Sequence, residues 1–234
     1  MHLPLFISLL VLGAEALIQE IQLSDETLEF MARGIEHTVN LEERASTCIS
    51  KEHKNCQAGF NTAIGLDPSI DWNDPEAIVK QVNEYGTGNI TQSLTLCAAR
   101  AKFYQCLGKQ YYSCMSMYNL MSKTTLQKAH RYLDLFYGVD FLCNAGFEAM
   151  HQFECIATIG MSHSYQPCVD TMNAQITGHP ERLCDAVNKA GRCINDVYAT
   201  TCTADPRGAG WFGCQSFVGS FEESCYTVPR CYVH

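Results

Sequence analysis

The stretch LCAARAKFYQC, residues 96–106, is repeated in outline by LCDAVNKAGRC, residues 183–193. Both stretches hold two cysteines nine residues apart, and Cys97 and Cys106 each lie 87 residues before their counterparts, Cys184 and Cys193. Between the cysteines, alanine and lysine recur at matching positions with no proline. Such a sequence favours a helix, so a helix carrying two cysteines is predicted to occur twice in the chain.

Matches outside these stretches extend the repeat. CQAGF at residues 56–60 matches CNAGF at residues 143–147, again 87 residues apart, and Cys114 lies 88 residues before Cys202. A fixed period of this length is typical of a duplicated structural unit. We therefore predict two related tandem units that repeat with a period of about 87 residues. The first, residues 17–142, also includes an N-terminal helix, the second spans residues 143–234, and Phe60 and Phe147 are expected at equivalent core positions.

Helix signals dominate the rest of the chain. Ser24 precedes acidic residues and an apolar stripe through Leu28 and Met31, and Asp74-Pro75-Glu76 has an N-cap followed by a first-turn proline. His179-Pro180-Glu181 precedes the second cysteine-bearing helix, and residues 123–160 read as one long helix with bends near Gly138 and Gly146. Alternation typical of strands is hard to find, so the predicted fold class is an all-α, disulfide-stapled helical bundle.

Cysteine spacing limits how such a helix can be cross-linked. If Cys97, Cys106 and Cys114 share one helix, Cys97 and Cys106 lie roughly 13.5 Å apart, whereas a disulfide spans about 7 Å at most between Cα atoms. A nine-residue step also turns them to opposite faces. We expect this helix to be stapled to neighbours on at least two sides.

The cysteine count indicates an oxidising compartment. The chain has 14 cysteines and no C-x2-C pair of the kind typical of zinc knuckles. We predict that all are disulfide-bonded: Cys48, Cys56, Cys97, Cys106, Cys114, Cys143, Cys155, Cys168, Cys184, Cys193, Cys202, Cys214, Cys225 and Cys231. Sequence does not fix the connectivity, and our working expectation is two closed quartets, 56/97/106/114 and 143/184/193/202, with local pairs 155–168 and 214–225. Cys48 and Cys231 would then pair with each other or cross-pair with other cysteines.

Several features indicate a secreted protein. Residues 1–16 hold an apolar run followed by Ala14-Glu15-Ala16, which is typical of a signal peptide and its cleavage site. Asn89-Ile90-Thr91 is an N-glycosylation sequon, so Asn89 is a predicted glycosylation site. The formal charge of −9 argues against nucleic acid as a partner, and no later stretch is long and apolar enough for a membrane span.

Motifs for catalysis and metal binding are weak. Glu148 and His151 form E-x-x-H, with Glu154 one turn further on, but a carboxylate-bridged di-iron bundle needs a second such motif. His151 and His163 lack an H-E-x-x-H arrangement, and G-x-S-x-G and phosphate-binding glycine loops are absent. We expect a non-enzymatic protein with no catalytic residues, no metal site and no cofactor.

Two stretches rich in aromatic and sulfur-bearing side chains allow a second interpretation. Tyr132, Phe136, Tyr137 and Phe141 cluster on one predicted helix, and Met115, Met117 and Met121 follow Cys114. At helical spacing such residues most often form core. The alternative is that they line a site for an apolar ligand between helices.

LDLFYGVDFLCNAGFEAMHQFECI, LCAARAKFYQCLGKQYYSC and GAGWFGCQSFVGSFEESC together resemble nematode secreted cysteine-rich proteins that carry a domain of unknown function, number 19 in that series. Chondroitin proteoglycan 4 type domains are looser relatives. The resemblance covers most of the chain after residue 16 and implies a secreted helical module without catalytic residues. Chondroitin attachment needs Ser-Gly dipeptides, and the chain has none.

The expected function is therefore that of a secreted, extracellular binding or structural component with an unidentified protein or matrix partner. The alternative is a carrier that holds a lipid-like, apolar small molecule between its helices.

Overall fold

The computed structural model describes residues 21–36, 48–87, 90–222, 224–225 and 231, and everything below concerns these residues. They form helices without any β-strand, which confirms the predicted all-α class. The α-helices are α1 (Asp25–Glu36), α3 (Ser50–Ala63), α4 (Pro75–Thr87), α5 (Ile90–Leu107), α6 (Tyr111–Cys114), α7 (Met117–Met121), α8 (Leu126–Cys143), α9 (Phe153–Ser162), α10 (Gln166–Ile176), α11 (Leu183–Thr201) and α12 (Pro206–Val218). Four 3₁₀ segments, η1 (Gly108–Gln110), η2 (Ala145–Gln152), η3 (Pro180–Arg182) and η4 (Gly219–Phe221), join some of them.

Helix starts follow the sequence signals. The backbone N–H of Thr27 donates to Ser24 Oγ at 3.2 Å before α1, and that of Ala77 donates to Asp74 Oδ1 at 3.4 Å at the start of α4. Pro180 opens the 3₁₀ turn η3, which leads directly into α11. Short side-chain caps thus satisfy orphan backbone donors where they were predicted.

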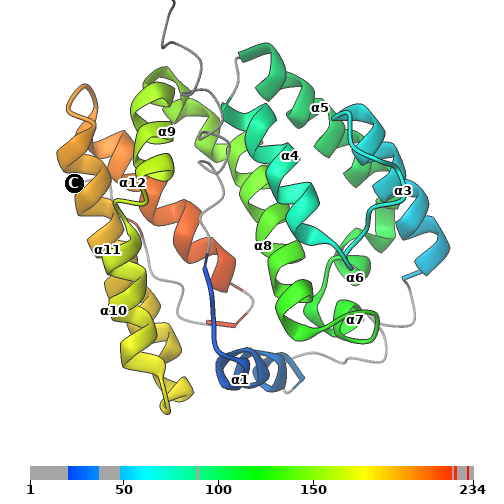
Figure 1. The fold of residues 1–234 in the computed structure, drawn as a ribbon, viewed down its shortest axis with the longest axis horizontal. Helices are drawn as coiled ribbons and strands as arrows, with labels where there is room; N and C mark the ends of the chain where they lie inside the picture. The colour runs from blue at the N-terminus through cyan, green and yellow to red at the C-terminus, as the bar shows by residue number, and fades with distance from the viewer. Residues whose placement is uncertain (1–20, 37–47, 88–89, 223, 226–230, 232–234) are drawn as a thin grey trace, which may run out of the picture.

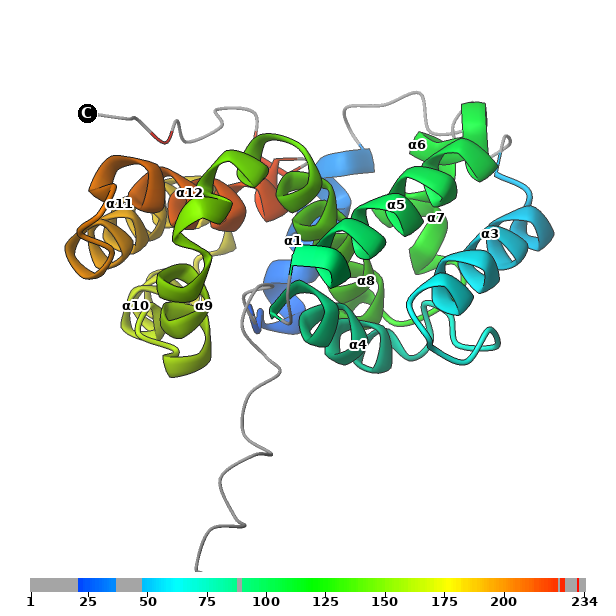
Figure 2. The ribbon, with the colours of Figure 1, turned by 90° about the horizontal axis from the view of Figure 1, so that it is seen from above.

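Helix α8 lies at the centre of the molecule (Figures 1 and 2). Helices α3–α7 pack around it on one side, and α9–α12 form a second group that reaches α8 through η2 and η4. Helix α1 packs against α8 and α7 and also touches η3, so it lies between the two groups. The arrangement leaves α8 as the common wall of both groups.

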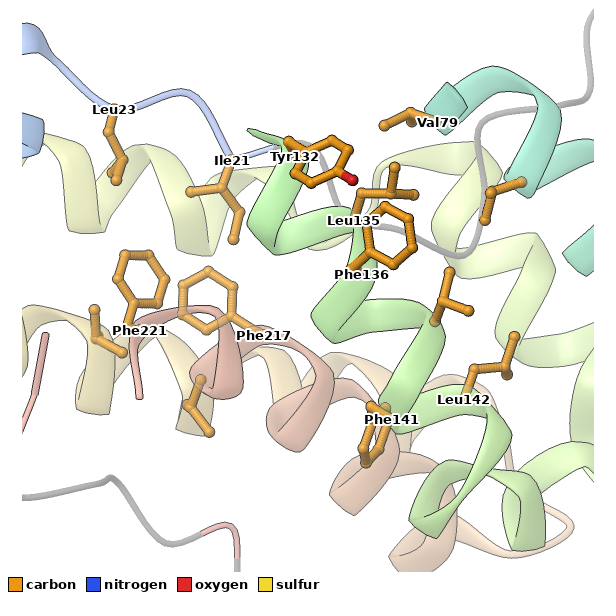
Figure 3. Packing of buried hydrophobic residues seen from close by; sticks show 14 of the residues in the cluster. Ile21, Leu23, Val79, Tyr132, Leu135, Phe136, Phe141, Leu142, Phe217 and Phe221 are labelled. Atoms are coloured by element: carbon orange, nitrogen blue, oxygen red, sulfur yellow. The ribbon is translucent and has the colours of Figure 1, made fainter. Parts of the chain in front are cut away.

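One hydrophobic cluster runs through both groups of helices. On α8, Tyr132 and Leu135 are fully buried, and Phe217 near the end of α12 and Phe221 on η4 are fully buried in the same cluster (Figure 3). Ile21, before α1, is buried in the same cluster. Because the apolar contacts are continuous, the two groups of helices share one core rather than forming two separate ones.

All fourteen cysteines form disulfides, as predicted. The pairs are Cys48–Cys114, Cys56–Cys106, Cys97–Cys143, Cys155–Cys202, Cys168–Cys193, Cys184–Cys225 and Cys214–Cys231. The predicted closed quartets and the local pairs 155–168 and 214–225 are therefore wrong. As the helix geometry required, Cys97 and Cys106 do not pair with each other but tie α5 to α8 and to α3.

The order of pairing recurs along the chain. In the six cysteines from Cys48 to Cys143, the first pairs with the fifth, the second with the fourth and the third with the sixth. The six from Cys155 to Cys225, leaving out Cys214, pair in the same order. No disulfide joins these two blocks, so residues 144–154 connect them through the main chain alone. The tandem duplication and the boundary at 142/143 stay predictions, and the Cys97–Cys143 disulfide crosses that boundary.

Two local predictions are wrong for a visible reason. Cys114 does not share a helix with Cys97, because α5 ends at Leu107 and Gly108 adopts a left-handed conformation with φ +52° before α6 begins. Phe147 is 38% exposed on η2, whereas Phe60 is buried on α3, so the two phenylalanines do not fill equivalent core positions.

The long helix predicted over residues 123–160 is interrupted. α8 runs through Gly138 without a break and ends at Cys143, and the 3₁₀ segment η2 replaces the predicted bend at Gly146. Among the described residues, no helix is both long and apolar enough to cross a bilayer. The predicted signal peptide and Asn89 lie outside the described residues.

Candidate functional site: a cavity beside α8

A cavity of about 460 Å³ lies beside α8, between α1, α6, α7 and the turn that follows α12. Its walls combine methionine and aromatic side chains with a few polar groups. The lining residues are Met31, Tyr111, Tyr112, Met115, Met117, His130, Leu133, Asp134, Phe136, Tyr137, Asp140, Gly219, Ser220, Glu222 and Ser224. We call this the Met–Tyr cavity, and its volume is in the range typical of small-molecule sites.

Some of the apolar residues singled out in the sequence line the cavity, and the others pack in or against the core away from it. Met115, Met117, Phe136 and Tyr137 line the Met–Tyr cavity. The other three, Tyr132, Phe141 and Met121, pack in or against the core, where Phe141 meets Trp211 and Phe212 at ring distances of 5.5 and 5.2 Å. Met115, Met117 and Phe136 also belong to the buried core, so a position beside the cavity does not exclude a packing role, and a bound ligand stays a prediction.

The methionines give the wall an adaptable surface. Met31 comes from α1, Met115 follows α6 and Met117 begins α7, so three separate elements each contribute one thioether. Methionine is unbranched and polarisable, and it adjusts its shape to irregular apolar contents more easily than leucine or isoleucine. Tyr112 is 66% exposed, so the cavity reaches the protein surface at this residue.

A glycine shapes the opposite wall. A Cβ added to Gly219 would lie 1.6 Å from the Tyr137 hydroxyl oxygen, so the phenol ring rests directly on the backbone of η4. Burial raises the pKa of Tyr137 to about 12, and this side chain is therefore neutral at physiological pH. The contact fixes the Tyr137 ring as a rigid boundary between α8 and η4.

The charged groups in the lining are acidic, but the two on α8 are paired with arginines. Ser220 Oγ donates to Asp134, and Arg131 Nη1 lies 3.6 Å from Asp134 Oδ2. Asp140 forms an ion pair with Arg100. Glu222 is an exposed third carboxylate, and the lining contains no lysine or arginine. A bound carboxylate would face these like charges without a cation on the wall, which disfavours anionic ligands.

His130 is the most unusual polar group in the wall. It is 5% exposed, and its buried Nε2 atom has no hydrogen-bond partner. Burial lowers the pKa of His130, with Asp134 opposing and Arg131 adding to the shift, so the imidazole is neutral at physiological pH. An unsatisfied buried polar atom costs about 1–3 kcal/mol.

The same histidine borders a second cavity. This cavity has a volume of about 360 Å³ and lies between the segment before α1 and the start of α8, lined by Ile21, Gln22, Leu23, Leu28, Glu76, Gln127, His130 and Arg131. His130 therefore lies where the two cavities approach each other. No sequence motif marks His130, although its spacing to Leu133 and Tyr137 places all three on one face of α8.

The E-x-x-H residues lie elsewhere. Glu148 and His151 are on the 3₁₀ segment η2, where His151 Nδ1 lies 2.8 Å from the Glu148 backbone oxygen and Nε2 lies 3.7 Å from Asp205 Oδ2. His163 ends α9 with φ 50°. The group of potential metal-ligand side chains found in the described residues is instead Cys48, His53 and Cys114, in which both cysteines are oxidised to a disulfide.

No protein family, curated protein or solved structure matches the chain. The resemblance to nematode cysteine-rich proteins rests on the quoted residues and stays a prediction.

Proposed function

We propose that this chain is a secreted, non-enzymatic binding protein that holds an uncharged apolar molecule in the Met–Tyr cavity. The observation that carries the proposal is a cavity of about 460 Å³, lined by methionine and aromatic side chains, in a cross-linked helical protein. Of the two functions expected from the sequence, the carrier is the one this cavity favours. The proposed compartment rests on the seven disulfides, which persist in oxidising surroundings.

The chemistry of the wall supports an uncharged ligand with one hydroxyl group. A neutral imidazole nitrogen is either a donor or an acceptor, and a hydroxyl can play both complementary roles. A hydroxyl that reaches His130 Nε2 would satisfy it in either tautomer, while the rest of the ligand contacts methionine and aromatic side chains. A fatty acid in the cavity would instead bring a carboxylate into a lining that already holds Asp134, Asp140 and Glu222.

Polar contacts in the cavity support binding rather than catalysis. A hydrolytic serine needs a hydrogen bond to its general base, but Ser220 Oγ donates to Asp134, and His130 Nε2 is without a partner. Asp134 is held between the Ser220 hydroxyl and the Arg131 guanidinium, and these two contacts fix the position of its carboxylate.

The test measures displacement of the neutral dye Nile red from the purified, fully oxidised protein. Dodecanol, dodecylammonium and dodecanoate serve as competitors with one chain length and different head groups. We expect dodecanol to displace the dye and dodecanoate to be the weakest competitor. Failure of the wild-type protein to bind the dye and all three competitors would overturn the proposal.

A matched pair of variants locates the binding. Leu133→Trp fills the Met–Tyr cavity from α8, whereas Leu94→Trp adds the same ring on α5 at a side chain that is 53% exposed and outside the lining. We expect dye binding to be lost in the first variant and kept in the second. Equal binding by both variants would place the apolar site elsewhere.

A further inference from the structure

The disulfide Cys48–Cys114 has surroundings suited to its reduced form. It joins the residue before Ile49, the N-cap of α3, to the last residue of α6, with Cys48 half-buried and Cys114 fully buried. Lys123, in the connection between α7 and α8, places Nζ 3.8 Å from Cys48 Sγ. An imidazole nitrogen of His53 lies within 4.8 Å of both sulfur atoms.

The lysine has no carboxylate partner among the described residues. Its ammonium group lies 4.9 Å from the centre of the Trp72 ring, on which it shares a cation–π contact with Lys54 at 5.4 Å. Lys54 is paired with Asp71 at 3.0 Å, but Lys123 has no such ion pair. Burial, together with Lys54, lowers the pKa of Lys123. A thiolate on Cys48 would give this half-buried cation the opposite charge that it lacks.

His53 presents a second unsatisfied group. The Tyr132 hydroxyl donates to Gln57 Oε1, so it accepts from His53 Nε2, which lies 3.2 Å away and therefore carries the proton. This leaves Nδ1 as an acceptor, buried and without a partner. Burial lowers the pKa of His53 to about 3, so the ring is neutral. A disulfide has no proton to donate to Nδ1, whereas a thiol does.

We propose that Cys48–Cys114 is a reducible disulfide that exchanges with a dithiol reductant. A thiolate of the dithiol attacks Cys48 Sγ, the more accessible sulfur, and forms a mixed disulfide while Cys114 leaves as a thiolate and takes up a proton beside His53. The second thiolate of the dithiol then attacks the reagent's sulfur atom in the mixed disulfide. The bond from that sulfur to Cys48 Sγ breaks, the reagent closes its own disulfide, and Cys48 is released as a thiolate beside Lys123. The protein disulfide gains two electrons, and the dithiol loses two.

Reduction changes the surroundings of both Lys123 and His53 in a favourable direction. The Cys48 thiolate pairs with the Lys123 ammonium group, and the Cys114 thiol brings a proton to within reach of the His53 imidazole. In the oxidised pair, Cys48 Sγ is only a weak, neutral acceptor for Lys123 Nζ, and Cys114 has no proton to donate. Stabilising the reduced form raises the reduction potential of a disulfide, which distinguishes a labile bond from a structural one.

The test is the order in which the seven disulfides open. The fully oxidised protein is titrated with dithiothreitol at pH 8, trapped with N-ethylmaleimide and mapped by mass spectrometry. If solvent exposure determined the order of reduction, Cys56–Cys106 and Cys168–Cys193 would open first, because Cys106 and Cys193 are exposed. We expect Cys48–Cys114 to open first, and initial reduction at either exposed pair would overturn the proposal.

Variants of Lys123 test the electrostatic cause. A thiol pKa lowered by about two units, within the usual range beside a lysine, makes reduction at pH 8 about 20-fold more favourable. Lys123→Met removes the charge and keeps the length, so the equilibrium constant for reduction of Cys48–Cys114 should fall about that much. Lys123→Arg keeps the charge and should stay near wild type. An unchanged equilibrium constant in Lys123→Met would equally overturn the proposal.

Discussion

His130→Phe should make the protein more stable and a poorer binder of alcohols. Phenylalanine keeps a planar ring of similar size on α8 and removes the buried nitrogen that has no partner. Leaving such an atom unpaired costs about 1–3 kcal/mol, so its removal should raise the free energy of unfolding by about 1 kcal/mol or more. Phe221, whose ring centroid is 6.4 Å from that of His130, offers the new ring an aromatic neighbour.

Binding should change in the opposite direction. One hydrogen bond contributes about 0.5–1.5 kcal/mol, so the Kd of dodecanol should rise roughly two- to tenfold in the variant. Affinity for Nile red depends on the apolar wall and should change little. The preference for dodecanol over dodecanoate should shrink as the hydroxyl loses its partner.

Both effects are measured on one preparation. Urea unfolding with disulfides intact can be followed through the fluorescence of Trp72 and Trp211, and dye displacement gives the Kd. His179→Phe is the control, because His179 lies on an exposed turn outside both cavities. A variant of His130 that is destabilised by more than 1 kcal/mol, or that keeps the full alcohol preference, would refute the reasoning.

Three further changes follow from other contacts. The unfolded chain protonates His53 near pH 6.5, whereas burial lowers its pKa in the folded chain to about 3. The contribution of His53 to stability is therefore full above pH 6.5, and the free energy of unfolding should fall by about 2 kcal/mol by pH 5 in urea titrations. A free energy of unfolding that does not change over this pH range would contradict a neutral, buried His53. Gly219→Ala should cost about 1–3 kcal/mol and abolish dye binding, because the new Cβ displaces Tyr137, whereas Gly59→Ala, with no atom within 4 Å of the new Cβ, should be neutral or slightly stabilising. Asn61→Ala should cost about 2–4 kcal/mol in thermal or urea unfolding, because its buried amide donates to two backbone oxygens of the following loop at 3.0 and 2.8 Å; a loss below 1 kcal/mol would show that those oxygens find other partners.

Local signals in the sequence predicted the helices well. Asp74 and Pro75 act within one turn of each other, so the start of α4 depends on residues that are adjacent in the chain. The end of α5 was missed although its signal was present, since Gly108 is followed by a lysine and a polar residue, as at many helix ends.

Cross-links and cavities depend on residues far apart in the chain. Cys48 and Cys114 are separated by 66 residues, and their pairing requires the packing of α3 against its neighbours to be known. The Met–Tyr cavity likewise forms only when α1 and η4 lie beside α8, and no local sequence pattern predicts that these three elements are neighbours. The repeat was informative at Cys97, Cys106 and Cys114, which occupy the same places in the pairing order as Cys184, Cys193 and Cys202. It misled at Cys56 and Cys143, which are the second and sixth cysteines of one block.

The absence of a disulfide across residues 144–154 determines what a protease can release. Between residues 48 and 143, and between 155 and 231, every position is enclosed by at least one cross-link, so a single cut there leaves one covalent molecule. A cut in η2 would instead give two fragments that separate on a non-reducing denaturing gel. A single proteolytic cut within either disulfide-linked block would therefore leave the size of the unreduced molecule unchanged. A cut in η2, where Phe147 and Glu148 are exposed to solvent, would divide it.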